Sequence, residues 1–256
     1  MSNILSDTSK QDEYLKSNIS NMVQTAQFKY YAKFTDFLDE RQQAIAVKHL
    51  KTLGYQNYSF FGGAEDCERT MLGIFSPNAS TDSCVFPIKT IQIEYSDRVE
   101  ISHRDCLGAL MGLQIKRSSI GDIIIADGKA IFFVTDDIAS FILLNLNKVS
   151  KANVKVSINE GKLIEKKQGF DIIEGTVSSL RLDCVVSLLT SKSRSVSAQM
   201  IQSQMVKVNH FDIENVSYMI KPNDVVAIRG KGKFIIGSET KLTKKNRLYI
   251  TVKKLL

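Results

Sequence analysis

A short stretch of the chain, SKSRS, places two cations among three hydroxyl groups directly before an amphipathic segment. Backbone N–H groups at a helix start, together with the positive end of the helix dipole, favour a phosphate group. Lys192 and Arg194 would add full positive charges beside those N–H groups. Ser195, Gln199 and Gln202 follow on one side of the segment. These residue types predict binding of a sugar-phosphate backbone without recognition of a particular base.

Two helices must position these side chains. Apolar residues in 182–189 recur at i, i+3, i+4 and i+7, which is typical of a helix with one buried face. That face consists of Leu182, Val185, Val186 and Leu189. A second helix follows, capped by either Ser193 or Ser195. Its inward-facing residues are predicted to be Ala198, Ile201 and Met205.

A strand is predicted directly after the second helix. In 206–209, Val-Lys-Val-Asn, apolar and polar residues alternate, so Lys207 and Asn209 are expected to face away from the core. A turn over 222–224 and a second strand over 225–229 follow.

Positive charge is concentrated in the C-terminal third of the chain. The 256 residues carry a net charge of +7, but residues 175–256 contain 14 Lys and Arg against 5 Asp and Glu, a net charge of +9. Basic turns between strand-like pieces contribute Arg229, Lys231 and Lys233. A basic module beside a near-neutral body favours a polyanionic partner, although basic C-terminal tracts can also serve solubility alone.

Composition argues against several classes of protein. No run of about 18 apolar residues is present, and the first thirty residues lack the apolar core of a signal peptide. We therefore expect a cytoplasmic protein with no membrane contact. The four cysteines are scattered and are predicted to be free thiols: Cys67, Cys84, Cys106 and Cys184. The three histidines are too dispersed to predict a metal site: His49, His103 and His210.

Three short motifs resemble catalytic sequences without their context. "HRD" at 103–105 would need an Asn where Leu110 stands, so a helix start with a partly buried His103 is the better interpretation. Asp183 in "RLD" opens an amphipathic helix and is expected to orient Arg181 or to cap backbone N–H groups. "GKGKFI" lacks the third Gly of a dinucleotide loop. We therefore expect no cofactor.

The middle of the chain, 85–158, alternates strand, helix, strand, strand, helix and strand, with a hairpin at Asp127-Gly128. This order is that of ferredoxin-like and RNA-recognition-motif-like domains. The expected third strand, "KAIFFVTD", lacks the Gly-aromatic signature of the RNA-recognition motif. Lys116 and Arg117, near the end of the first helix, are secondary candidates for RNA contact.

The N-terminal third is predicted to begin with helices over 10–53, because Phe34, Phe37 and Leu38 recur near helical spacing. Two strands should follow, joined by a turn at Gly62-Gly63. The acidic stretch "GGAEDCER" contains Glu65, Glu68 and Arg69 and leaves two alternatives open: a simple turn, or a binding or hydrolytic role for these three side chains.

The C-terminal pattern resembles a known RNA-binding domain. The matching pieces are "RLD" (181–183), "SR" (193–194), Ile201, "VKVN" (206–209) and "NDVVAIRG" (223–230). Together they resemble the α-L domain named after small-subunit ribosomal protein four, called the S-four domain below. The chain departs from that pattern at Gln204 and His210, where the family usually has Gly.

Further segments resemble the YlmH family of bacterial RNA-binding proteins: "FTDFLDERQQAIA", "FFGGAEDCER" and "HRDCLGALMGLQIKRSSIGDIII". The resemblance implies an α+β, multi-domain chain. Its parts would be an N-terminal α/β region (1–80), a central ferredoxin-like or RNA-recognition-motif-like domain (81–165) and an S-four domain (175–256).

The resemblance also implies a function. It predicts a non-enzymatic factor, monomeric, that binds ribosomal RNA on the large ribosomal subunit in ribosome-associated quality control, with a historical cell-division association. Peptidyl-tRNA is a further partner that it leaves open. The alternative is an RNA-modifying or RNA-processing enzyme anchored by its S-four domain. The residues expected to contact RNA are Arg181, Asp183, Lys192, Ser193, Arg194, Ser195, Gln199, Gln202, Lys207, Asn209, Arg229, Lys231 and Lys233, with Lys116 and Arg117 secondary.

Overall fold

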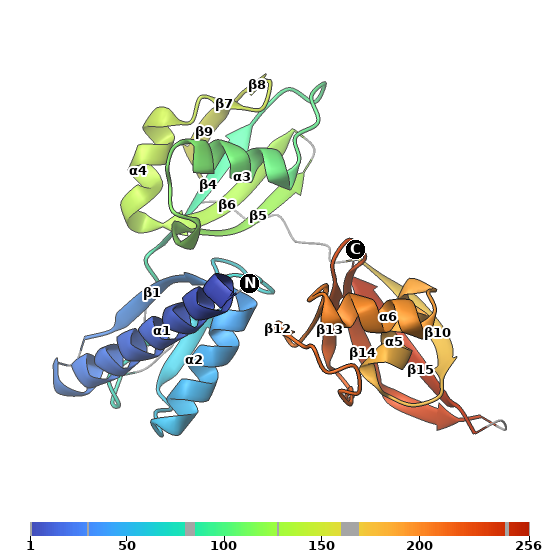
Figure 1. Cartoon of the computed structure of the whole chain (residues 1–256). Coiled ribbons are helices and arrows are strands. Elements are labelled where there is room, and N and C mark those ends of the chain that lie inside the picture. Colours follow the sequence, from blue (N-terminus) through green and yellow to red (C-terminus); the bar gives the residue numbers. More distant parts are fainter. Residues whose placement is uncertain are drawn as a thin grey trace. The chain divides into compact units, whose positions relative to one another are not determined.

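The computed structural model describes residues 2–29, 31–79, 85–126, 128–159, 169–243 and 246–255. The chain divides into two compact units, Met1–Lys166 and Lys167–Leu256, and each is considered by itself (Figure 1). None of the described helices is long and apolar enough to cross a membrane. Cys67, Cys106 and Cys184 are free thiols, as predicted, and Cys84 lies outside the described residues.

The first unit begins with two helices packed on a small antiparallel sheet. The helices are α1 (Ser2–Lys29) and α2 (Glu40–Thr52), and the strands are β1 (Lys33–Leu38), β2 (Tyr58–Phe61) and β3 (Thr70–Ile74). The strand order is β1-β3-β2. Ile19 of α1, Leu50 of α2 and Leu72 of β3 are completely buried in the shared core. The two strands predicted on either side of Gly62-Gly63 are therefore confirmed.

The prediction of helix throughout 10–53 is wrong at β1. Leu38 packs into the core with α1 and α2, whereas its neighbour Phe37 packs into a second core on the opposite side of the sheet. The register of β1 against β3 also shifts between Phe34 and Phe37. Burial on both faces and this shift in register together replace the period-2 alternation of a strand with a spacing that resembles a helix.

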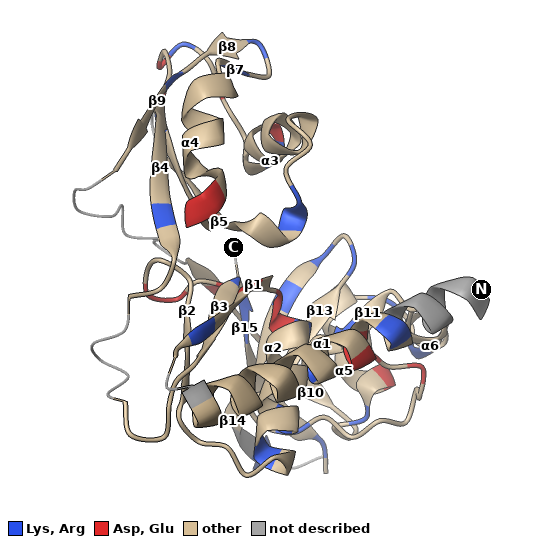
Figure 2. Ribbon diagram, turned by 90° about the vertical axis from the view of Figure 1, so that its left-hand side faces the viewer, with Lys and Arg blue, Asp and Glu red and all other residues tan. Residues whose placement is uncertain are grey.

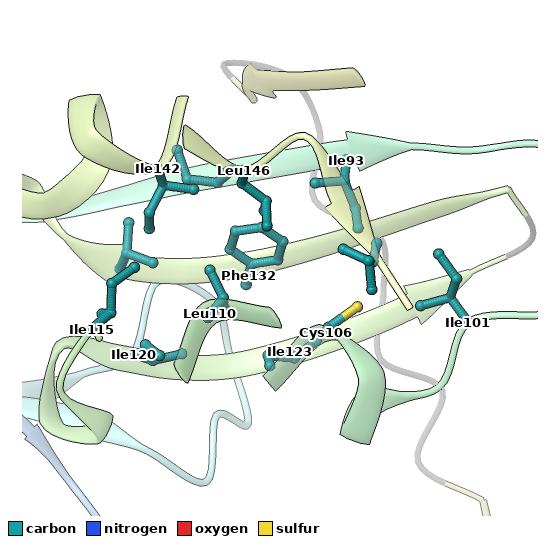
Figure 3. Close-up of a cluster of buried hydrophobic side chains, with 14 of the residues drawn as sticks. Ile93, Ile101, Cys106, Leu110, Ile115, Ile120, Ile123, Phe132, Ile142 and Leu146 are labelled. Carbon is teal, nitrogen blue, oxygen red and sulfur yellow. The ribbon is translucent and has the colours of Figure 1, made fainter. Parts of the chain in front are cut away.

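The rest of the first unit holds a four-stranded antiparallel sheet of order β5-β6-β4-β9. Its elements are β4 (Ile88–Glu94), α3 (His103–Gly112), β5 (Ile120–Ala126), β6 (Lys129–Thr135), α4 (Asp136–Asn145) and β9 (Lys155–Ile158), with a small hairpin of β7 (Lys148–Val149) and β8 (Ala152–Asn153) before β9. Leu110 of α3, Phe132 of β6 and Ile142 of α4 are completely buried together (Figure 3). The two helices thus cover one face of the sheet.

The "HRD" segment starts helix α3, as predicted. Ser102 is the N-cap, and its hydroxyl accepts a hydrogen bond from the Asp105 backbone N–H at 3.2 Å. The Asp105 carboxylate accepts from the Ser102 backbone N–H at 2.9 Å and completes a capping box. His103 is exposed rather than partly buried.

The other face of the central sheet is partly covered by the N-terminal region. Phe37 and Met71 share a buried cluster with Ile124, Ile131 and Phe133 of β5 and β6. The contact is close: a Cβ on Gly63, whose φ is +104°, would lie 2.2 Å from the Phe133 ring. In an RNA-recognition motif, this face of the sheet stacks bases. Here the β5–β6 part of it is occupied by protein.

The second unit is a six-stranded sheet of order β10-β15-β14-β13-β11-β12, with two helices. Its elements are β10 (Phe170–Val177), α5 (Leu182–Thr190), α6 (Arg194–Gln202), β11 (Val206–Val208), β12 (Phe211–Asp212), β13 (Val225–Ile228), β14 (Gly232–Leu242) and β15 (Leu248–Leu255). The domain start predicted at 175 falls inside β10, which pairs with β15 along its whole length. The unit therefore begins before 175.

The predicted pattern of this unit agrees with its core. The α5 stripe is buried, with Leu182, Val185 and Val186 completely inaccessible. Val206 and Val208 of β11 are buried in the same cluster, while Lys207 is exposed.

Candidate nucleic-acid interface

The start of α5 is fixed by a segment from a later part of the chain. The Leu182 backbone N–H donates to the Tyr218 carbonyl oxygen at 2.8 Å, and the Asp183 N–H donates to the Val216 carbonyl oxygen at 3.2 Å. Arg181, the N-cap residue, forms an isolated β-bridge with Met219. These bonds satisfy N–H groups that a helix start otherwise leaves unpaired, and they fix the direction in which Asp183 leaves the helix.

Asp183 joins the two arginines of the predicted interface. Its side chain is only 6% exposed. Arg181 Nε lies 3.1 Å from Asp183 Oδ1, and Arg194 Nη2 lies 2.6 Å from Oδ2. Arg194 Nε also donates to Oδ2, at 3.2 Å. The helix starts of α5 and α6 are thus linked through one buried carboxylate.

Hydrogen bonds within this cluster stabilise the charged forms of Asp183 and Arg194. Burial alone would raise the pKa of the Asp183 carboxyl, but hydrogen bonds from Arg194 and Arg181 outweigh it and hold the pKa below its ordinary value. The same hydrogen bond raises the pKa of Arg194. Both guanidinium groups also remain accessible: the Arg181 side chain is 40% exposed and the Arg194 side chain 56%. The carboxylate holds each guanidinium on one edge, and a phosphate could approach the rest.

The turn between α5 and α6 presents the predicted phosphate-binding stretch. Ser191 ends α5 in the left-handed conformation, and the Ser187 hydroxyl donates to the Lys192 carbonyl oxygen at 2.6 Å. Ser193 is the N-cap of α6, since its hydroxyl accepts from the Val196 N–H at 3.3 Å. Of the two predicted caps, Ser193 is therefore the one used. Lys192 and Ser195 are exposed beside it.

Helix α6 separates buried from exposed side chains nearly as predicted. Ile201 is completely buried, and Gln199 and Gln202 are exposed. The second fully buried residue is Ser197, whose hydroxyl donates to the Ser193 carbonyl oxygen at 3.0 Å. Ala198, which was predicted to face inward, is only half-buried.

Asn209 was predicted to contact RNA, but its side chain holds a turn together. Its amide donates to Asp224 Oδ1 at 2.8 Å, and its Oδ1 accepts from the Val225 N–H at 2.9 Å. Asn209 and His210 both have positive φ, as does Gln204 after α6. The chain therefore adopts left-handed backbone at the two positions where the resembled family usually has Gly.

Two lysines that were predicted to contact RNA, Lys207 and Lys233, lie on the other side of the sheet from the arginine cluster. Lys207 and Lys233 both lie opposite Ala227, so their side chains share one side of the sheet. That side is the one away from α5 and α6, because Val206 and Val208 face the helices. Arg229 and Lys231 are exposed around the β13–β14 turn. Figure 2 colours the Lys and Arg positions blue.

Comparison with known proteins assigns the chain to a family. The family description "Putative RNA-binding domain in YlmH" matches residues 82–162, and "S4 domain" matches residues 180–226. A protein of Bacillus subtilis (strain 168), named ribosome-associated protein quality control protein P2, is 33% identical over 229 residues, 88% of either chain. The chain belongs to the YlmH family.

A solved structure supports the fold within this family. The structure, described as cell division protein ylmH from Streptococcus pneumoniae, is similar with a TM-score of 0.51 at 18% sequence identity. The similarity covers 58% of this chain and 91% of that one. The S-four match itself spans α5, α6 and β11 and ends in β13, so β14 and β15 lie beyond it.

Arg117, a secondary candidate for RNA contact within the matched central region, is half-buried and hydrogen-bonded to the protein backbone. Its guanidinium donates to the Ile120 carbonyl oxygen, and its side chain lies beside that of Arg69. Burial, followed by the repulsion from Arg69, lowers the pKa of Arg117 to about 10. Lys116, the other secondary candidate, is exposed.

The "GGAEDCER" stretch has a structural role that the sequence did not reveal. Asp122 of β5, 8% exposed, accepts hydrogen bonds from the backbone N–H groups of Glu68 and Arg69, both at 2.9 Å. The Arg69 side chain donates to the carbonyl oxygens of Ile120 and Phe37 at 3.0 and 2.9 Å. The stretch therefore joins the N-terminal sheet to the central sheet. The available signal was the single Asp in the apolar strand "IGDIIIA".

Proposed function

We propose that this YlmH-family chain binds structured RNA through the surface formed by Arg181, Lys192, Arg194, Ser195 and the exposed side of α6. The observation that carries the proposal is the buried Asp183 carboxylate, which holds two exposed guanidinium groups from different helices. A preorganised guanidinium loses less side-chain freedom when a phosphate binds. Asp183 is then a positioning residue and not itself an RNA contact.

The RNA is, in this proposal, ribosomal RNA of the large subunit, in the cytoplasm. The support comes from the RNA-binding family descriptions and from the name of the Bacillus subtilis relative, which refers to ribosome-associated quality control. The chain would act as a monomer on stalled particles, with peptidyl-tRNA as an adjacent partner. A link to cell division is supported only by the description of the Streptococcus pneumoniae neighbour.

The central domain has a smaller part in the proposal. Its strand order β5-β6-β4-β9 supports the ferredoxin-like or RNA-recognition-motif-like interpretation. Because part of its sheet is covered by the N-terminal region, we propose that it adds contacts through exposed side chains such as Lys116 rather than by stacking bases on the sheet.

The proposal is for a factor without catalytic activity. Among the described residues, no group of three or more His, Cys, Asp or Glu side chains could hold a metal ion. The alternative, an RNA-modifying enzyme, would leave a missing modification in ribosomal RNA or tRNA of deletion cells. Mass analysis of those RNAs separates the two functions.

The direct test is a pair of double variants. Arg181→Ala with Arg194→Ala should lower affinity for large ribosomal subunits by roughly a hundredfold, since each charge-assisted bond contributes on the order of tenfold. The control is Lys48→Ala with Lys51→Ala, which removes two exposed cations from α2, outside the matched RNA-binding domains. Wild-type co-sedimentation of the Arg181/Arg194 variant would overturn the proposed surface.

Salt dependence provides a second measurement. If about five charges of the basic segment meet phosphates, the plot of log affinity against log salt concentration should have a slope of about −4. A slope near zero would contradict the proposal.

A further inference from the structure

The sheet of the C-terminal unit has a second face that the proposed RNA surface does not use. Residues Val206, Ile228, Phe234 and Val252 are buried in one cluster with residues of α5 and α6, so they point toward these helices. Their neighbours along each strand therefore point to the opposite side. We call this side the outer sheet face and define it by Phe170, Lys207, Lys233, Lys241, Tyr249 and Lys253.

Strand register gathers four lysines on the outer sheet face from three strands, β11, β14 and β15. Lys207 and Lys233 flank Ala227 in one row across β11, β13 and β14. Lys253 of β15 lies opposite Ile235. Lys241 lies opposite Tyr249, further along the β14–β15 ladder. Directly paired residues in antiparallel strands place their side chains on the same side, so these four ammonium groups face the same way.

Apolar side chains lie among these lysines with an unusual degree of exposure. Phe170 is 52% exposed and Ile172 is 50% exposed, on the edge strand β10. The Lys253 ammonium lies 5.1 Å from the centre of the Phe170 ring. Tyr249 is half-buried and hydrogen-bonds to Glu174, which raises the pKa of its phenol.

The charge of the face is predominantly positive. Its described acidic side chains include Glu174, beside Tyr249, and Asp212, whose Oδ1 lies 3.5 Å from Lys207 Nζ. Four lysines and the exposed Phe170 ring on one sheet face match an unpaired nucleic-acid strand, since phosphates bind ammonium groups and bases stack on rings. A protein partner of ordinary composition would not require both features.

We propose that the outer sheet face is a second RNA-binding surface, which takes a single-stranded or looped RNA segment. Phosphates lie along Lys207, Lys233 and Lys253, and an unstacked base packs on Phe170. This surface is on the opposite side of the sheet from Arg181 and Arg194, and most of it lies on strands beyond the matched S-four segment. It does not depend on the proposed function of the arginine cluster.

The experiment compares two RNA probes on the full chain. One is an oligouridine of about 12 nucleotides, and the other is an RNA hairpin with a stem of about 12 base pairs. Lys233→Gln with Lys253→Gln should weaken oligouridine binding about tenfold and reduce the salt slope by about 1.4, since two single-strand phosphate contacts are lost. Phe170→Ala should weaken it at least fivefold, because a stacked base is lost.

Two further variants locate the effect. Arg181→Ala with Arg194→Ala should weaken binding of the hairpin and leave oligouridine binding within about twofold of wild type. Each surface would then bind its RNA probe independently of the other. Lys48→Gln with Lys51→Gln removes the same charge from exposed positions of α2, outside the matched RNA-binding domains, and should change the binding of neither RNA probe. Melting temperatures of all variants check that they are folded.

Two results would overturn the inference. The first is wild-type affinity of the Lys233/Lys253 variant for oligouridine. The second is a loss of co-sedimentation with ribosomal particles without any loss of RNA affinity, which would assign the face to a protein partner instead.

Discussion

Each unit of the chain contains a buried aspartate associated with a pair of arginines. The arginines bond to the protein backbone in one cluster and to the aspartate in the other. Asp122 accepts from backbone N–H groups, while Arg69 and Arg117 turn inward to backbone carbonyl oxygens. Asp183 instead accepts from both guanidinium groups and leaves them partly exposed. The first arrangement joins two parts of the fold, and the second presents positive charge.

The difference follows from what surrounds each carboxylate. In the first unit, the Ile120 carbonyl oxygen at the start of β5 accepts hydrogen bonds from both guanidinium groups, and burial lowers the pKa of Arg69 and Arg117. In the second unit, Asp183 is the acceptor for the arginines at two helix starts. The local acceptors therefore decide whether an arginine stabilises the fold or is available for a ligand.

The largest effect on stability is expected from Asp122, which joins the N-terminal sheet to the central sheet. Asp122→Ala leaves the N–H groups of Glu68 and Arg69 without their carboxylate and should lower the free energy of unfolding of the first unit by about 3 kcal/mol. Affinity for the RNA hairpin should stay within about twofold, because the change lies outside the arginine cluster. Urea denaturation and hydrogen exchange of 62–69 measure the effect. Asp97→Ala, at an exposed aspartate, is the control.

Arg117→Ala tests whether an inward-turned arginine has any part in RNA binding. It should lower the free energy of unfolding by about 1–2 kcal/mol through the lost bond to the Ile120 carbonyl oxygen. RNA affinity, measured by fluorescence anisotropy, should not change. A tenfold loss of affinity with unchanged stability would reverse the comparison between the two clusters.

Asp183→Asn tests whether the carboxylate positions the two exposed arginines for RNA binding. An amide cannot pair with two guanidinium groups as the carboxylate does, so hairpin affinity should fall about tenfold although the net charge rises from +7 to +8. Asp212→Asn makes the same charge change at an exposed position on the other face and should leave hairpin affinity within about twofold. Tighter binding by the Asp183 variant would mean that the carboxylate merely repels RNA.

The lowered pKa of Asp183 predicts that the stability of the C-terminal unit falls at acidic pH. A carboxyl group whose pKa is depressed by folding contributes stability above its unfolded pKa, and this contribution is lost as the pH falls through the folded pKa. The C-terminal unit should therefore lose stability below about pH 4. Melting temperatures between about pH 6 and pH 3 should fall less for Asp183→Asn than for wild type.

The smallest effect is expected at Lys116, the exposed neighbour of Arg117. Lys116→Ala should lower RNA affinity by less than about threefold, since a single exposed ammonium makes one salt-screened phosphate contact. Stability should not change. Parallel titrations at low and moderate salt measure it, and a larger loss would give the central domain a greater part in binding.

Much of the second unit could be predicted from the sequence alone. The apolar stripe of α5, a cap at either Ser193 or Ser195 and the alternation around Lys207 are local patterns that the sequence shows directly. Net charge and the matching S-four pieces then indicate a polyanion-binding module. The helix and strand order of 85–158 was predicted for the same reason.

Tertiary structure decided the rest. Phe37 and Leu38 form a strand because each packs into a different core, which no local period reveals. Arg117 turns inward because backbone carbonyls of β5 and the side chain of Arg69 lie beside it. Asp183 meets Arg194, 11 residues further along the chain, because α5 and α6 pack together. Hydrogen bonds between distant residues depend on geometry that forms only when the chain is packed, so a sequence predicts the types of side chain and the fold sets their partners.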